Sequence, residues 1–169
     1  MFQNQVAVTP AIGIPGDFAS TNPRQHLVSG TADQFMVADA DGVTIAHFAI
    51  LNADGTVTSL PAFADVTPSR LGFVHRALGS ALITTWLAEA GSVIQPGQGV
   101  ELFALGDFFA VADAITGTPT RGAAVIWDPA TGLINIGATA GAATVDTGFI
   151  LLSETAVAGQ IVMIGKNGA

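Results

Sequence analysis

Short runs of apolar residues, separated by Gly, Pro, Asp and Asn, follow one another along most of this 169-residue chain. Such spacing is typical of β-strands joined by tight turns. The expected strands are 43–51, 56–60, 82–87, 100–105, 108–112, 123–127, 133–136, 144–152 and 160–164. Residues 82–87 run into Leu87-Ala88-Glu89-Ala90, which favours a helix, so both structures stay open there. No segment has the apolar repeat of an amphipathic helix of about twelve residues.

Turn signals lie between the expected strands. Asp128-Pro129-Ala130-Thr131-Gly132 predicts the clearest hairpin, because Pro presets the turn dihedral and Gly accepts the left-handed position. Asp41-Gly42 and Asp54-Gly55 are further turn pairs, and Gly106-Asp107 is expected to separate 100–105 from 108–112. In 144–152 the alternation predicts one buried face, made of Val145, Thr147, Phe149 and Leu151.

Eight or nine short strands without helices predict an all-β fold. We expect residues 24–169 to form a single domain, either a β-sandwich, jelly-roll-like or otherwise, or a β-barrel.

Residues 1–23 differ from the rest of the chain in composition and predict an extended N-terminal arm. Pro10, Pro15 and Pro23 prevent a helix and remove donors that a central strand would need. The segment is nevertheless apolar, so it must lie against a surface, either of its own domain or of a neighbouring molecule. Its candidate contact residues are Phe2, Val6, Val8, Ile12, Ile14, Phe18 and Arg24.

Charge is scarce. Five Lys and Arg and 13 Asp and Glu make 11% of the chain, with a net charge of −8, and the mean hydropathy is +0.56. Ordinary domains carry about a quarter charged residues. A lone globule with so little charge should be poorly soluble, so we expect part of the surface to be covered in an assembly.

The same composition argues against several partners. Five scattered basic residues cannot neutralise a run of phosphates, so no nucleic-acid binding is expected. The longest uncharged stretch, 129–145, is broken by Gly and contains Asn and Thr, so it predicts no membrane span. The absence of Cys excludes disulfides and thiolate chemistry.

No motif for catalysis, cofactor binding or metal binding is present, and we expect no enzymatic activity and no cofactor. His26, His47 and His75 are not spaced as metal ligands. Asp39-Ala40-Asp41-Gly42 begins like a calcium loop but lacks the closing Glu, and a turn explains it better. Trp86 and Trp127 are expected in the core, although either could serve a carbohydrate-binding surface.

Several blocks of the sequence, in this order, resemble the structural cement proteins of tailed bacteriophages. The blocks are Phe2-Gln3-Asn4-Gln5-Val6, Gly16-Asp17-Phe18-Ala19-Ser20, Asn22-Pro23-Arg24, Gly72-Phe73-Val74-His75-Arg76, Leu87-Ala88-Glu89-Ala90-Gly91, Ile94-Gln95-Pro96-Gly97 and Gly106-Asp107-Phe108. They span about the first two thirds of the chain, and the last third is similar to these proteins only in its composition.

The resemblance implies a protein on the outer surface of a phage head that bridges neighbouring major capsid protein subunits and stabilises the shell. It also implies a homo-oligomer, with a trimer favoured over a dimer. The alternative is a carbohydrate- or receptor-binding β-sandwich of a virion or cell surface.

Overall fold

The computed structural model describes residues 12–28, 35–77 and 92–166. Strands dominate these residues, with two single turns of 3-10 helix, η1 (Phe63–Asp65) and η2 (Pro68–Arg70). The strands are β1 (Gln25–His26), β2 (Val37–Ala38), β3 (Val43–Thr44), β4 (Phe48–Leu51), β5 (Thr56–Thr58), β6 (Leu71–Val74), β7 (Val93–Ile94), β8 (Leu102–Val111), β9 (Ala114–Ile115), β10 (Ala124–Trp127), β11 (Ile134–Ile136), β12 (Val145–Leu151) and β13 (Ile161–Lys166). The predicted all-β fold is confirmed.

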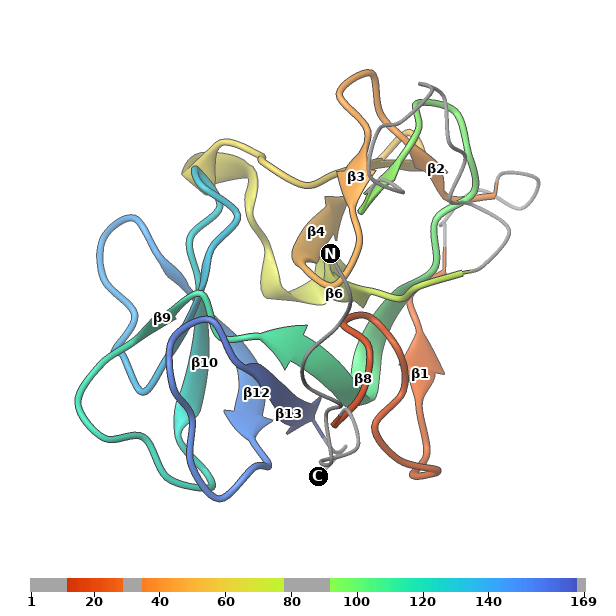
Figure 1. The fold of residues 1–169 in the computed structure, drawn as a ribbon. Coiled ribbons are helices and arrows are strands. Elements are labelled where there is room, and N and C mark those ends of the chain that lie inside the picture. Colours follow the sequence, from red (N-terminus) through yellow and green to blue (C-terminus); the bar gives the residue numbers. More distant parts are fainter. Residues whose placement is uncertain (1–11, 29–34, 78–91, 167–169) are drawn as a thin grey trace, which may run out of the picture.

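One large sheet, with strand order β2-β5-β4-β6-β8-β13-β12-β10-β11-β9, carries the fold, and β1 also pairs with β8. Strands β3 and β7 form a separate small sheet. In Figure 1, β8 runs between the group around β4 and β6 and the group around β10, β12 and β13. The order has two ends, so among the described strands the sheet is not closed into a barrel.

Aromatic contacts show that the two halves of the large sheet pack face to face. Phe48 of β4 lies 5.3 Å from Phe149 of β12, centroid to centroid, although these strands are far apart in the sheet order. Phe73 of β6 lies 6.4 Å from the same ring, although β8 and β13 separate β6 from β12 in the sheet order. The sheet therefore folds back on itself around β8, as in a sandwich, and buries one apolar core between its halves.

The turn predictions with local signals are confirmed. Strands β10 and β11 pair across the Asp128–Gly132 turn, where Asp128 accepts the backbone N–H of Ala130. Strands β4 and β5 pair across the Asp54-Gly55 turn. There the hydroxyl and the backbone N–H of Thr56 donate to Asp54, and they hold the pKa of this carboxyl below its ordinary value. The buried face of β12 contains Thr147, Phe149 and Leu151, as predicted, with Val145 partly buried.

The expected strand 43–51 is wrong as one element. It is split into β3 and β4, which belong to different sheets. Ala46, with φ 64°, takes a left-handed conformation between them. A left-handed residue interrupts an extended strand, and Ala rarely adopts this conformation, so nothing in the run Val43–Leu51 signals it.

The expected turn at Gly106-Asp107 is also wrong. Residues 102–111 form one continuous strand, β8, and both residues lie inside it. Gly106 has φ 136°, which bends the strand without ending it. Asp107 is therefore a buried strand residue rather than a turn residue.

The expected strand 82–87, with Trp86, lies outside the described residues. Among the described residues, the structure has no helix of the length and apolarity that a membrane crossing requires.

Candidate functional site: the N-terminal segment on β8

Residues 12–22, which we call the docked segment, run along β8 of the same chain. The N–H of Gly16 donates to the carbonyl of Phe109 (2.8 Å), and the N–H of Phe109 donates to the carbonyl of Asp17 (3.0 Å). Further along, the N–H of Ala19 donates to the carbonyl of Asp107 (2.9 Å). Strand β1 then continues the same antiparallel direction against Leu105 and Phe103. Figure 1 shows the segment, in red, leading into β1 beside β8.

Phe18 attaches the docked segment to the core. Its ring centroid lies 4.1 Å from that of His75, in a stacked geometry, and 3.8 Å from the guanidinium carbon of Arg24. Two groups can come this close to one centroid only from opposite faces, so Phe18 is sandwiched between them. Phe103, which meets Phe18 edge to face, and the tilted ring of Phe108 complete the contact. The Nδ1–H of His75 donates to the carboxylate of Glu101 at 2.8 Å, which fixes the imidazole plane under Phe18.

A buried carboxylate forms the second attachment. Asp107 is only 4% exposed, and the side chains of Ser20 (2.6 Å) and Asn22 (2.5 Å) both donate to its Oδ2. Its Oδ1 is buried without a hydrogen-bond partner. We call Ser20, Asn22 and Asp107 the polar cluster. Because a buried carboxylate is costly when it loses its donors, Oδ2 of Asp107 keeps its two hydrogen bonds only while the segment stays docked.

Gly13 marks the point of closest approach to β8. A Cβ built on Gly13 would lie 2.5 Å from the ring of Phe109, so the residue facing this ring has no room for a side chain. Its neighbours point the other way, with Ile12 66% and Ile14 49% exposed. The docked segment thus begins with two isoleucines turned away from the domain.

The arm residues expected to make contacts divide into three groups. Phe2, Val6 and Val8 lie outside the described residues. Phe18 and Arg24 pack together against their own domain, whereas Ile12 and Ile14 are exposed.

Sequence reasoning missed Asp107, His75 and Glu101 as partners of this segment. A signal was present in the blocks that resemble the cement proteins. Four of these blocks meet at this place in the structure: 16–20, 22–24, 72–76 and 106–108.

The other candidate residues of the sequence do not converge. His26 lies on Phe103, and the Nδ1–H of His47 donates to the carbonyl of Ile45. Among the described residues, no three His, Asp or Glu side chains are grouped as metal ligands. Trp127 is fully buried, so the expectation that it lies in the core is confirmed, and it cannot form a carbohydrate platform.

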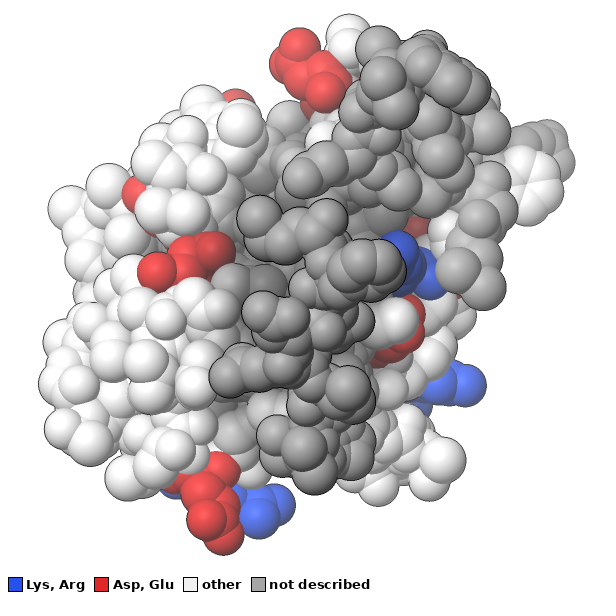
Figure 2. Space-filling view, viewed as in Figure 1, with Lys and Arg blue, Asp and Glu red and all other residues white. Residues whose placement is uncertain are grey.

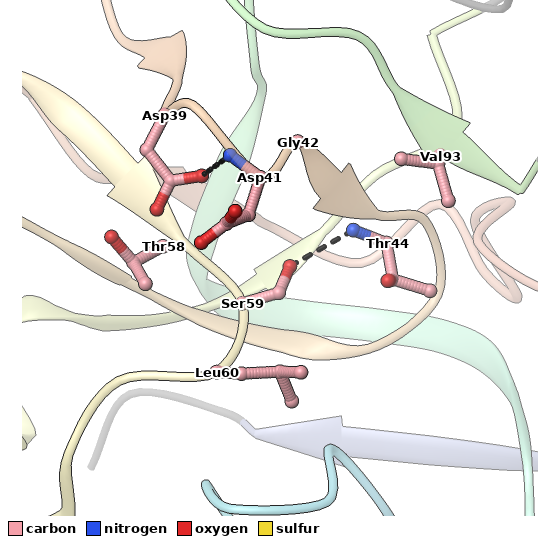
Figure 3. Close-up of a pocket in the computed structure, with 8 residues that line it drawn as sticks. All are labelled: Asp39, Asp41, Gly42, Thr44, Thr58, Ser59, Leu60 and Val93. Carbon is pink, nitrogen blue, oxygen red and sulfur yellow. Dashed lines mark hydrogen bonds between the residues drawn. The ribbon is translucent and has the colours of Figure 1, made fainter.

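The residues that began like a calcium loop line a small pocket, shown in Figure 3. The N–H of Asp41 donates to the carboxylate of Asp39 (3.1 Å), and the N–H of Thr44 donates to the hydroxyl of Ser59 (2.9 Å). The pocket holds about 170 Å³, less than the roughly 300 Å³ at which ligand sites begin. The two carboxylates therefore belong to a turn, as predicted.

The described residues form a small β-rich fold whose N-terminal segment is docked on its own sheet. Within the capsid proteins of phages, a family model described as XM1 gp53 minor capsid protein matches residues 2–166, and the chain belongs to this family. A chain of the solved structure described as "The capsid of Myoviridae Phage XM1" is 17% identical to this one, with a TM-score of 0.64. The match covers 98% of this chain and 97% of that chain, and it shows a shared fold. No curated protein matches.

Family membership makes the chain a phage capsid-associated protein. It is a component of the virion with a structural role, and it associates with other components of the capsid.

Proposed function

We propose that the chain is a cement protein. It binds the outer surface of the phage head, bridges neighbouring major capsid protein subunits and stabilises the shell without catalysing a reaction. The observation that carries the proposal is the docked segment, which is fixed to the domain by Phe18 and Asp107 and presents Ile12 and Ile14 outward.

Apolar side chains presented in this way suit contact with another protein. Complete burial of one isoleucine side chain contributes about 1.5–3 kcal/mol. Ile12 and Ile14 supply two such side chains, and Phe2, Val6 and Val8 of the same arm are further candidates in the sequence. An extended chain also offers backbone hydrogen bonds to a partner, as in β-strand addition.

Stabilisation of the shell follows from mass action. A protein that binds the assembled shell, and not its separated subunits, stabilises the shell by its binding free energy. A homo-oligomer, which we propose is a trimer, multiplies this effect because several arms engage at once.

The scarcity of charge supports a surface made for protein contacts. On the face shown in Figure 2, charged side chains are few, and most of the described surface is uncharged. The net charge of −8 also suits a position outside the head, because an acidic protein is not captured non-specifically by DNA.

The test replaces Ile12 and Ile14 by Ser in the full chain. The variant should fold normally, because both side chains are exposed, but it should bind heads that lack this protein at least about tenfold more weakly. Such heads should also lose the protection against heat that the wild-type protein gives. Binding is measured by co-sedimentation, and head survival by electron microscopy after heating.

The matched control is Val157→Ser. Val157 is 52% exposed, comparable with Ile14, but it belongs to the loop before β13. It should bind and protect heads as the wild-type protein does. Normal decoration and protection by the Ile12→Ser/Ile14→Ser variant would show that the described part of the arm does not bind the shell.

A further inference from the structure

We propose that Gly13 and Asp107 together lock the register of the docked segment on β8, and that this register determines which arm side chains face the capsid. The inference rests on the proposed function and names two positioning residues for it. Neither residue needs to touch the capsid.

Gly13 provides the first half of the lock. Gly13 faces β8 and its two neighbours are exposed, so a shift of the chain by one residue would exchange these positions. Such a shift would place Ile12 or Ile14 over the ring of Phe109. At that position even a Cβ would lie 2.5 Å from the ring, so neither isoleucine fits.

Asp107 provides the second half, further along the segment. Ser20 and Asn22 reach the same oxygen, Oδ2, from alternate positions, which is possible in one register only. Their loss would leave the whole carboxylate, already without a partner at Oδ1, buried and unsatisfied. Buried polar groups are best known for setting register, because mispaired alternatives are penalised.

The consequence for function lies at Ile12 and Ile14. In the locked register these two side chains are exposed and point away from β8. A shift by one residue would turn them toward their own domain and present Gly13 to the shell instead.

The first measurement is amide hydrogen exchange in the isolated full-length protein, at Gly16, Ala19 and Phe109. These three N–H groups make the backbone bonds between the segment and β8. In Gly13→Ala and in Asp107→Val they should exchange about tenfold faster or more, while Ile126 of β10 stays protected. Asp107→Asn keeps an acceptor oxygen for Ser20 and Asn22 and should restore the protection.

One control and one independent test variant separate register from general stability. Gly141→Ala also adds a methyl group, but its Cβ would meet nothing closer than 3.6 Å. In this variant the amides of Gly16, Ala19 and Phe109 should exchange at the wild-type rate. Gly13→Ala changes only the surface contact with Phe109, so it tests the lock even if Asp107→Val does not fold.

The second measurement is head binding by the same variants. Gly13→Ala and Asp107→Val should bind at least about tenfold more weakly, and Asp107→Asn nearly as the wild-type protein does. If the three amides exchange at the wild-type rate in both Gly13→Ala and Asp107→Val, the lock is overturned, regardless of the result of the head-binding measurement. Faster exchange with unchanged head binding overturns its role in positioning.

The proposed function is judged separately. Loss of binding by Ile12→Ser/Ile14→Ser with normal exchange at Gly16, Ala19 and Phe109 supports it even if the lock fails.

Discussion

A single aromatic residue, Phe18, connects the N-terminal segment to the core of the domain. Its contacts with Phe103 and Phe108 continue the aromatic cluster of β8, while Arg24 and His75 cover its two faces. The face of an aromatic ring carries partial negative charge, so the guanidinium of Arg24 is attracted to it. The segment is therefore fixed by the core itself as well as by backbone hydrogen bonds.

A double-mutant cycle between Phe18 and Arg24 should measure this attraction. Phe18→Leu keeps an apolar side chain but removes the ring, and Arg24→Gln removes the charge. We expect a coupling energy of about 0.5–1 kcal/mol, because Arg24 is exposed. Urea unfolding of the four proteins gives the value.

The control cycle pairs Phe18→Leu with Arg121→Gln, a charge in the loop before β10, and it should give no coupling. Additive effects in the Phe18 and Arg24 cycle would mean that the guanidinium contributes nothing beyond its own packing.

Among the elements, β8 is the one on which the fold depends most. It pairs with β6 and β13 in the large sheet, carries β1, and receives the docked segment. The hairpins β4–β5 and β10–β11 were predictable because their signals are local: a turn sequence between two apolar runs. Strand β8 was not, because Gly106-Asp107 has the composition of a turn. The burial of Asp107 depends on Ser20 and Asn22, more than 80 positions away in the chain.

The bend of β8 predicts the effect of Gly106→Ala. Gly106 has φ 136°, a value that residues with a side chain rarely adopt, and an added Cβ would lie 3.1 Å from the ring of Phe108. The substitution should therefore destabilise the protein by about 2 kcal/mol. Gly141→Ala, without a positive φ or a close neighbour, should change the free energy of unfolding by less than about 0.5 kcal/mol. Equal thermal and urea stability of the two variants would contradict this account of β8.

At the scale of the whole molecule, composition predicted more than any motif did. Half of the residues are hydrophobic and 11% are charged, and from this the sequence indicated an assembly before any contact was known. The docking of residues 12–22 could not be derived in the same way. An apolar extended segment has the same composition whether it lies on its own domain or on a neighbour, and the choice depends on the fit of Gly13 and Phe18 to distant residues.

The net charge and the apolar surface together predict how self-association responds to salt. Protomers of net charge −8 repel one another, and salt screens this repulsion, with a screening length that falls from about 30 Å at 0.01 M to about 10 Å at 0.1 M. If apolar surfaces hold the proposed trimer together, raising salt from about 0.02 M to about 0.5 M should lower its dissociation constant by about tenfold or more. An interface built from ion pairs would respond in the opposite direction. Sedimentation equilibrium at several protein concentrations measures both the stoichiometry and the constant. An oligomer that dissociates as salt rises would contradict the apolar interface, and a monomer at every salt concentration would contradict self-association in solution.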